Sequence, residues 1–420
     1  VGNTCFFVRN CIFVQLKGFF IKEINFSFNK HTSIIMIKHT LFFLLFFTFS
    51  FSQENITKGI IKDAETKETV PFVNILFKDN SGNLTGTMTN ENGEFSLQHI
   101  KEVEISHINY ETKKVVFETK EVEIYLSPKV YVLDELIISN VSGRDFLKSL
   151  IKDAKVRAVK NTKLTTYGRE IVKINNQYTK YSDAKMDYFI KKGNGKSVLQ
   201  INQSRAIKSN LQDSTSSVLN GMDSAYNVRD YVKYAYNFDG IENLIKSKEY
   251  TFDRYLRRDA SGFEYEFIKI IPNADSDELL YEGYVIVDNK SNKIIEFKVE
   301  IAESHKKNSK LKNILIAKLK LNDQSVWCKF KFVNNQYELV YYKSSFNIYI
   351  QMGKKIHDNV SGTFDLLVLD SKNDVEIPEK GFDGKTIFEA GTNYTEKFWK
   401  MNNIFPLKES EQQFVDSIKN

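Results

Sequence analysis

Long segments in which apolar and polar residues alternate dominate the second half of the chain. Between residues 263 and 370 they are joined by short turn sequences, for example at residues 288–293 and 333–337. Alternation with a period of two predicts half-buried β-strands. Strands that follow one another through short turns must be antiparallel. The sequence therefore predicts a large antiparallel sheet, which limits the fold classes that this chain can adopt.

Helical patterns are confined to a few places. Apolar residues recur at spacings of three and four from Asp145 to about Lys160, which predicts an amphipathic helix with Ser142 as its N-cap. One or two short helices are expected within residues 204–260, and another near the C-terminus. A long antiparallel run with one packed helix favours a soluble curved sheet. A small outer-membrane barrel with a periplasmic domain is the alternative that we keep open.

The start of the chain has the pattern of an export signal. Residues 36–53 read MIKHTLFFLLFFTFSFSQ, with a basic start, an apolar run and small residues before Gln53. The apolar run is about half the ~20 residues that span a bilayer. We therefore interpret residues 36–52 as a cleaved signal peptide, and residues 1–35 as an upstream, non-native extension.

Charge and cysteine content narrow the functional classes. The formal net charge is +6, but residues 1–52 carry five basic residues and one acidic residue, so removing them leaves +2. This small excess does not support nucleic-acid binding. Of three cysteines, Cys328 alone would remain, which excludes a disulfide within one chain and a cysteine-based zinc site.

Residues 56–126 contain short apolar segments separated by turn signals every 8–12 residues. This spacing predicts about seven short strands in a small β-sandwich. The stretch GIIKDAETKETVPFVNILFKDNSGNLTGTMTNENGEFSL resembles the carboxypeptidase-D regulatory-like domain, a transthyretin-like β-sandwich. The residues that match the family pattern are Gly59, Asp63, Thr69, Pro71, Thr89, Asn90, Gly93 and Phe95.

The resemblance implies a non-catalytic module. In envelope proteins of the Bacteroidetes type, it often follows the signal peptide and precedes a second domain. The helix and the Arg169–Glu170 pair resemble the second domain of short proteins called carboxypeptidase-like regulatory domain-containing. The predicted organisation is a regulatory-like sandwich at 53–128, a linker at 129–143, a helix plus antiparallel β-rich domain at 144–395, and a C-terminal helical tail at 396–420.

Motifs for catalysis are missing from the sequence, which has no G-x-S-x-G, P-loop, H-E-x-x-H or G-x-G-x-x-G pattern. His99 and Glu102 have an H-x-x-E spacing that zinc peptidases use. They fall where a turn joins two predicted strands, so we expect a loop that leads into a strand. We predict no enzyme activity, no catalytic residue, no cofactor and no metal, and keep a hydrolase as the weakest alternative.

Aromatic residues at alternate positions of one predicted strand are the candidate binding residues. Tyr337, Tyr341, Phe346 and Tyr349 could line an apolar groove for a lipid, a glycan or a partner's strand, although ordinary core packing is the more common explanation of such a pattern. The sequence thus predicts an exported, non-enzymatic protein of the periplasm or outer membrane. It would bind an envelope protein or an apolar or glycan ligand through its β-rich domain.

Overall fold

The computed structural model describes residues 56–78, 84–107, 109–128, 134–136, 140–209, 227–258, 264–314, 317–354, 356–393 and 407–417. The predicted extension (1–35) and signal peptide (36–52) lie outside these residues. The described part is mainly β, as predicted, and belongs to one compact unit that spans residues 55–420.

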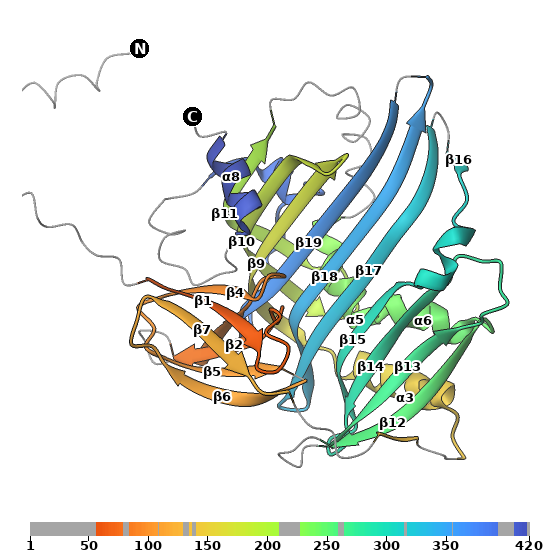
Figure 1. Cartoon of the computed structure of the whole chain (residues 1–420), viewed down its shortest axis with the longest axis horizontal. Helices are drawn as coiled ribbons and strands as arrows, with labels where there is room; N and C mark the ends of the chain where they lie inside the picture. Colours follow the sequence, from red (N-terminus) through yellow and green to blue (C-terminus); the bar gives the residue numbers. More distant parts are fainter. Residues whose placement is uncertain are drawn as a thin grey trace, which may run out of the picture. The chain divides into compact units, whose positions relative to one another are not determined.

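The seven strands described between residues 56 and 126 form two small sheets that enclose a shared core (Figure 1). One sheet has the order β4-β1-β7 and the other β3-β2-β5-β6, with β1 and β7 parallel and the other pairs antiparallel. The strands are β1 (Ile56–Asp63), β2 (Asn74–Lys78), β3 (Leu84–Met88), β4 (Glu94–Gln98), β5 (Glu102–His107), β6 (Tyr110–Val116) and β7 (Glu121–Leu126).

Residues of the sequence motif shape the turns of this sandwich. Asp63 ends β1, and its carboxylate accepts hydrogen bonds from the backbone of Glu65 and Thr66 and from the hydroxyl of Tyr110. The hydrogen bonds from Thr66 and Tyr110 hold the pKa of Asp63 below its ordinary value. A single side chain thus fixes the β1 turn and ties it to β6 in the other sheet.

The second motif turn lies between β3 and β4. The side-chain oxygen of Asn90 accepts the backbone N–H groups of Asn92 and Glu94, and Gly93 adopts a φ of +75° that most side chains disfavour. The ring of Phe95, which follows, is 1% exposed and fills the space beside Gly59, where a Cβ atom would collide with it. The buried position of the Phe95 ring therefore requires a glycine at residue 59.

Twelve described strands form one large antiparallel sheet. Its order is β11-β10-β9-β19-β18-β17-β15-β14-β13-β12-β8, with β16 paired to β17 (Figure 1). The strands are β8 (Asp134–Leu136), β9 (Lys160–Ile174), β10 (Gln177–Lys192), β11 (Val198–Lys208), β12 (Tyr250–Arg258), β13 (Glu264–Pro272), β14 (Tyr281–Asp288), β15 (Lys293–Ile301), β16 (Lys312–Ile314), β17 (Ala317–Val333), β18 (Gln336–Met352) and β19 (Ile356–Lys372).

The helices α3 (Gly143–Val156), α5 (Tyr231–Asn237) and α6 (Asp239–Lys246) pack on one face of this sheet, which we call the helix face. Their apolar sides join the main core, for example Leu147 of α3 and Tyr236 of α5. The side chain of Ser142 accepts the N–H of Asp145, which confirms the predicted N-cap. Among the described residues, no helix has the length and apolar character needed to cross a bilayer.

Short helical segments complete the described chain. They are the 3-10 turns η1 (Val228–Asp230), η2 (Glu303–Asn308) and η3 (Ile387–Ala390), and the helix α8 (Glu409–Ser417). The α5, α6 and α8 helices agree with the short helices expected from the sequence. Within the predicted linker, Asp134–Leu136 forms β8 and pairs with β12. The predicted domain boundaries otherwise stay predictions.

The strands β17, β18 and β19 each have 17 residues and extend well beyond the helices (Figure 1). The sequence has separate alternating segments at 312–322 and 326–333, whereas the structure has the short strand β16 and one long strand, β17, that runs through the polar residues between them. A shift in register between Leu321 and Asp323 absorbs one residue, so the strand continues through this polar stretch.

The outer face of the sheet, opposite the helices, carries a smaller apolar cluster near the sandwich. Met88 of the sandwich joins Tyr167, Tyr341 and Leu367 of the sheet in this cluster. Phe72 packs edge-on to the indole of Trp327, with ring centroids 4.7 Å apart. Residues from both faces of the large sheet are therefore buried, the outer face in part by the sandwich.

Candidate functional site

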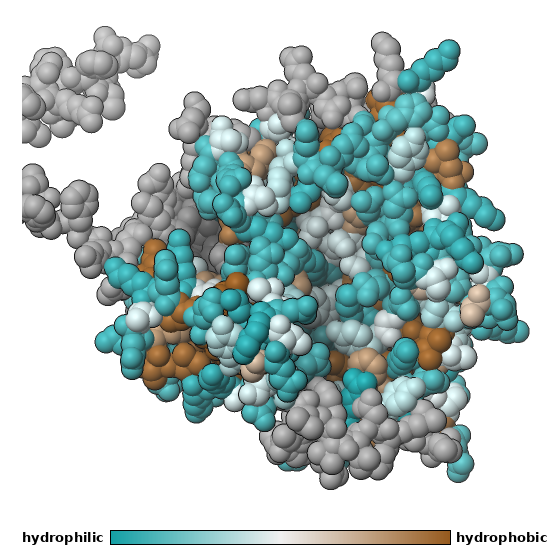
Figure 2. All heavy atoms as spheres, in the orientation of Figure 1, coloured by the Kyte–Doolittle hydropathy of each residue, from teal (hydrophilic) through white to brown (hydrophobic). Residues whose placement is uncertain are grey.

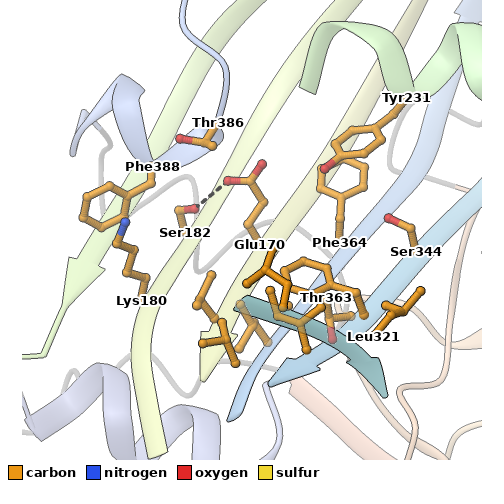
Figure 3. Close-up of a pocket in the computed structure, with 17 residues that line it drawn as sticks. Glu170, Lys180, Ser182, Tyr231, Leu321, Ser344, Thr363, Phe364, Thr386 and Phe388 are labelled. Atoms are coloured by element: carbon orange, nitrogen blue, oxygen red, sulfur yellow. Dashed lines mark hydrogen bonds between the residues drawn. The ribbon is translucent and has the colours of Figure 1, made fainter. Parts of the chain in front are cut away.

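An apolar cleft lies on the helix face of the large sheet, where the long strands extend beyond α5 (Figure 3). Its volume is about 270 Å³, near the lower end of the range of about 300–1,000 Å³ for small-molecule sites. The residues that line it are Glu170, Ile171, Val172, Lys180, Ser182, Tyr231, Leu319, Leu321, Ser344, Phe346, Ile348, Val360, Gly362, Thr363, Phe364, Thr386 and Phe388.

Aliphatic side chains form the floor of the cleft. Val172, Ile348 and Val360 come from β9, β18 and β19, and Leu319 and Leu321 come from β17. Neighbouring strands place residues of matching register on one face, and Ile348 is paired with both Leu321 and Val360. The result is a continuous hydrocarbon surface across four strands.

The end of the cleft nearest α5 is closed by aromatic rings. Tyr231 of α5 stacks on Phe364 of β19, with ring centroids 3.7 Å apart and planes tilted by 21°. A Cβ atom at Gly362 would collide with the ring of Phe346, so the glycine allows this ring to lie across β19. These packed rings therefore set the length of the cleft that a bound molecule could occupy.

Polar groups gather on the side of the cleft formed by β9, β10 and η3. The Glu170 carboxylate accepts the backbone N–H of Ile387 at 2.8 Å and the hydroxyl of Ser182 at 3.3 Å (Figure 3). The ammonium group of Lys180 lies 5.1 Å from the centre of the Phe388 ring, within the range of a cation–π contact. The cleft is thus amphipathic, with an aliphatic floor and one polar wall.

The structure separates the four aromatic residues that the sequence singled out. Phe346 lines the cleft, whereas Tyr337 is 1% exposed in the main core, where its oxygen accepts the N–H of Ile294. Tyr341 lies on the outer face and donates a hydrogen bond of 2.6 Å to Asp365. Tyr349, further along the same strand, bonds to His357 through its hydroxyl at 2.9 Å.

A β-bulge explains this separation. The register of β17 against β18 shifts between Lys329 and Phe330, so that Val340 has no partner on β17. An extra residue in one strand exchanges the faces of all later side chains. Tyr337 therefore shares a face with Phe346, and Tyr341 shares the other with Tyr349. The sequence pattern shows alternation but gives no signal for the position of the bulge.

Sequence reasoning missed the aliphatic floor residues as a group. Each lies at an alternate position of a predicted strand, for example Leu319 and Leu321, so the pattern was visible. Such residues are usually buried under a helix. Here α5 and α6 are short relative to the strands, so these two helices do not cover this part of the helix face.

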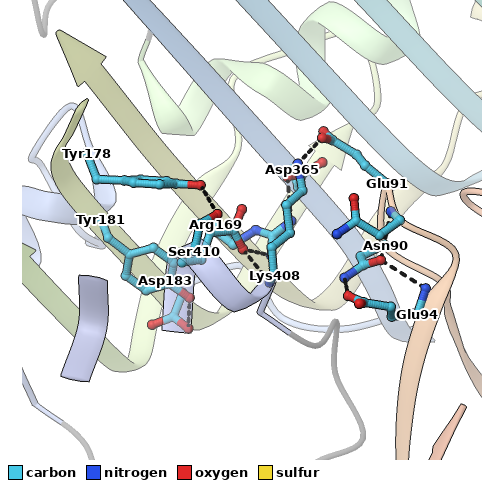
Figure 4. A network of polar contacts seen from close by, with 12 residues as sticks. Asn90, Glu91, Glu94, Arg169, Tyr178, Tyr181, Asp183, Asp365, Lys408 and Ser410 are labelled. Carbon is cyan, nitrogen blue, oxygen red and sulfur yellow. Dashed lines mark hydrogen bonds and ion pairs between the residues drawn. The ribbon is translucent and has the colours of Figure 1, made fainter. Parts of the chain in front are cut away.

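A buried charge network lies on the outer face, behind the polar wall (Figure 4). The guanidinium group of Arg169 contacts Asp365 at 3.1 Å and Glu411 of α8 at 3.2 Å, and the three side chains are 3–5% exposed. Burial alone would raise the pKa of Asp365, but the charges of Lys343 and Arg169 outweigh it and hold this pKa below its ordinary value.

The Arg169–Glu170 pair behaves as expected for neighbours in a strand. Arg169 enters the outer-face network, and Glu170 points to the cleft on the helix face. His99 lies in a turn with a φ of 58°, and Glu102 begins β5, which agrees with the predicted loop leading into a strand. Within the described ranges, no three or more His, Cys, Asp or Glu side chains gather closely enough to hold a metal ion.

Comparison with known proteins supports the sandwich assignment. The CarboxypepD_reg-like domain family matches residues 57–138, so the predicted regulatory-like domain is confirmed, and the match continues beyond the predicted end at 128. No curated protein matches the chain.

Two solved structures show distant similarity. One, from work on lipid–protein interactions in lipovitellin, has 8% identity and a TM-score of 0.23; the match covers 53% of this chain and 26% of that one. The other, a putative membrane-associated protein of unknown function from Bacteroides fragilis, has 9% identity and a TM-score of 0.12, with 76% and 98% covered. This chain spans about a quarter of the lipovitellin chain, and both TM-scores are too low to bear on its fold.

Proposed function

We propose, taking residues 57–138 as a CarboxypepD_reg-like domain, that the protein is an exported, non-enzymatic binding protein of the cell envelope. It holds the hydrocarbon chain of an amphiphile in the cleft on the helix face. The observation that carries this proposal is the aliphatic floor with a polar wall on one side. The export step rests on the signal pattern at residues 36–52.

The floor favours an acyl chain over a partner's strand. A strand is recognised by hydrogen bonds to an unpaired sheet edge, but Val172, Ile348 and Val360 lie on strands paired on both sides. The floor offers aliphatic surface in place of the directional polar groups that a glycan needs. Burial of hydrocarbon contributes roughly 0.8 kcal/mol per methylene group, which suits a flexible chain.

The polar wall suits the head group of the same molecule. Glu170, Lys180, Ser182 and Thr386 lie together at the β9–β10 side of the cleft. A head group placed there could exchange hydrogen bonds with them while the chain lies on the floor. An amphiphile therefore complements both the aliphatic floor and the polar wall, whereas a purely apolar molecule complements the floor alone.

Binding of a dansyl-labelled undecanoic acid tests the proposal. The wild-type protein should enhance and shift the dansyl fluorescence. Leu321→Asp places a charge on the floor and should weaken binding at least ten-fold, because a charge beside the chain would have to lose its water. Leu76→Asp, at a leucine of β2 that is 36% exposed, is the matched control and should bind like the wild type.

Two results would contradict the proposal. The wild-type protein could leave the probe's fluorescence unchanged, or Leu321→Asp could bind as tightly as Leu76→Asp. The non-enzymatic part has its own test, since mass spectrometry of a natural phospholipid and fatty-acid mixture after incubation should find every component chemically unchanged. Conversion of any component would show an enzyme.

A further inference from the structure

The outer face of β17, β18 and β19 carries a cluster of amide side chains directly behind the cleft. An open pocket of about 600 Å³ lies there, lined by Asn175, Asn176, Lys306, Asn322, Asp323, Asn347 and Asn359. Asn347 and Asn359 neighbour the floor residues Ile348 and Val360 in sequence, so they face the opposite side of the sheet. In Figure 2, hydrophilic side chains cover much of this end of the outer face.

Hydrogen bonds within the cluster orient its amides. The side-chain N–H₂ of Asn322 donates to the amide oxygens of Asn347 at 3.0 Å and Asn359 at 3.3 Å. With both oxygens occupied, the N–H₂ groups of Asn347 and Asn359 point away from Asn322. Neither has a hydrogen-bond partner among the described residues. The backbone N–H of Asn359 also donates to Asn175 at 2.9 Å, which holds the β9–β10 turn beside them.

The charges at the pocket are paired. The ammonium group of Lys306 contacts Asp323 at 3.3 Å and Glu303 at 2.7 Å. The pocket thus offers neutral amides and an ion pair, with no excess of either sign among its lining residues. An ionic ligand would gain little there. A ligand whose groups both donate and accept hydrogen bonds complements amides, which do the same.

A tyrosine lies next to the amides on the same face. Tyr349 pairs in register with Asn359 and is two residues from Asn347. It is half-buried, and its hydroxyl is held by His357 at 2.9 Å. A fixed aromatic ring beside fixed amides provides an apolar surface together with directed polar groups. This is the combination that a sugar ring requires, because its C–H groups and hydroxyls lie on different sides.

We propose that this outer-face pocket is a binding site for a neutral saccharide, with Asn347 and Asn359 as hydrogen-bond donors to its hydroxyls and Tyr349 beside the ring. The site is separate from the cleft and uses the opposite side of the same strands. The protein would then contact an amphiphile and a neutral glycan at once.

Affinity electrophoresis tests the saccharide site. The full chain is run in native gels that contain dextran, mannan or laminarin, all neutral, or the anionic polygalacturonate. At least one neutral polysaccharide should retard the wild-type protein. The double variant Asn347→Ala/Asn359→Ala should bind about ten-fold more weakly, since two hydrogen bonds are lost. Asn202→Ala, at an exposed asparagine of β11, is the control and should run like the wild type.

Three outcomes would overturn the proposal: no retardation by any of the three neutral polysaccharides, equal retardation of the double variant, or retardation by polygalacturonate alone. If the double variant fails to fold, Tyr349→Ala at the same site must show the loss instead. The dansyl assay separates this proposal from the previous one. Asn347→Ala/Asn359→Ala should keep binding the dansyl probe, and Leu321→Asp should keep its retardation by polysaccharide.

Discussion

Replacement of Arg169 by leucine gives the sharpest test of the buried network. Arg169 contacts two carboxylates, Asp365 at 3.1 Å and Glu411 at 3.2 Å, and all three side chains are almost fully buried. Removing one partner of a buried ion pair costs about 3–5 kcal/mol, because a charge is left without compensation in a medium of low polarity. Arg169→Leu leaves two such charges.

Two features of the structure limit the loss. The ammonium group of Lys343 lies 3.9 Å from Asp365 and still offsets part of its charge. Glu411 lies on α8, which can leave its site and return the carboxylate to water. We therefore expect the lower end of the range, about 3 kcal/mol in the free energy of unfolding, with α8 released first.

The assay is urea-induced unfolding followed by tryptophan fluorescence. Of the two tryptophans, Trp327 packs near Tyr341 on the outer face. Arg157→Leu is the matched control. Its ion pair with Asp153 is about one-third exposed and should contribute less than about 1 kcal/mol. Hydrogen exchange should show early loss of protection in α8 for Arg169→Leu.

An Arg169→Leu variant that is no less stable than Arg157→Leu would contradict this expectation. Equal instability of Arg169→Leu/Glu411→Leu and Arg169→Leu would also contradict it, because removing the second carboxylate should restore part of the lost stability. Either result would mean that water or a local rearrangement compensates the buried carboxylates.

Two further predictions concern the sandwich. Burial would raise the pKa of Glu91, but Lys343 and Lys408 outweigh it and lower this pKa to about 2 from an ordinary 4.5; its stabilisation is therefore complete above pH 4.5 and declines as the pH falls toward 2. Glu91→Gln should flatten the pH dependence of urea unfolding in that window, and an unchanged profile would count against the ion pairs. Gly59→Ala should destabilise the sandwich by about 1–3 kcal/mol through collision with Phe95, measured by thermal unfolding. A loss below about 0.5 kcal/mol, the usual size of the effect of a surface substitution, would contradict this packing.

Local patterns in the sequence accounted for much of the fold. Alternation over residues 263–370 predicted antiparallel strands, and the motif from Gly59 to Phe95 predicted the regulatory-like domain that the family comparison confirms. The Ser142 cap and the apolar spacing after it predicted α3. These features depend on neighbouring residues, through turn geometry and side-chain direction, so a sequence expresses them directly.

Contacts between distant segments were not predictable in the same way. Arg169 meets Asp365, 196 residues away, because β9 and β19 are neighbours in the sheet. That pairing joins the strands at the two ends of the domain, and no turn sequence specifies it. The network therefore could not be predicted from Arg169 and Glu170 alone. Strand alternation did correctly predict that these two side chains lie on opposite faces of the sheet.

The sequence by itself determined that this protein is mainly β, that a small regulatory-like sandwich precedes a large antiparallel sheet, and that Tyr337, Tyr341, Phe346 and Tyr349 lie along one strand. The tertiary structure alone decided which of those residues share a face. One bulge at Val340 moved Tyr341 and Tyr349 to the outer face and turned Phe346 into the cleft. Side-chain direction has a period of two, so a single unpaired residue, whose position depends on packing across the sheet, reverses it.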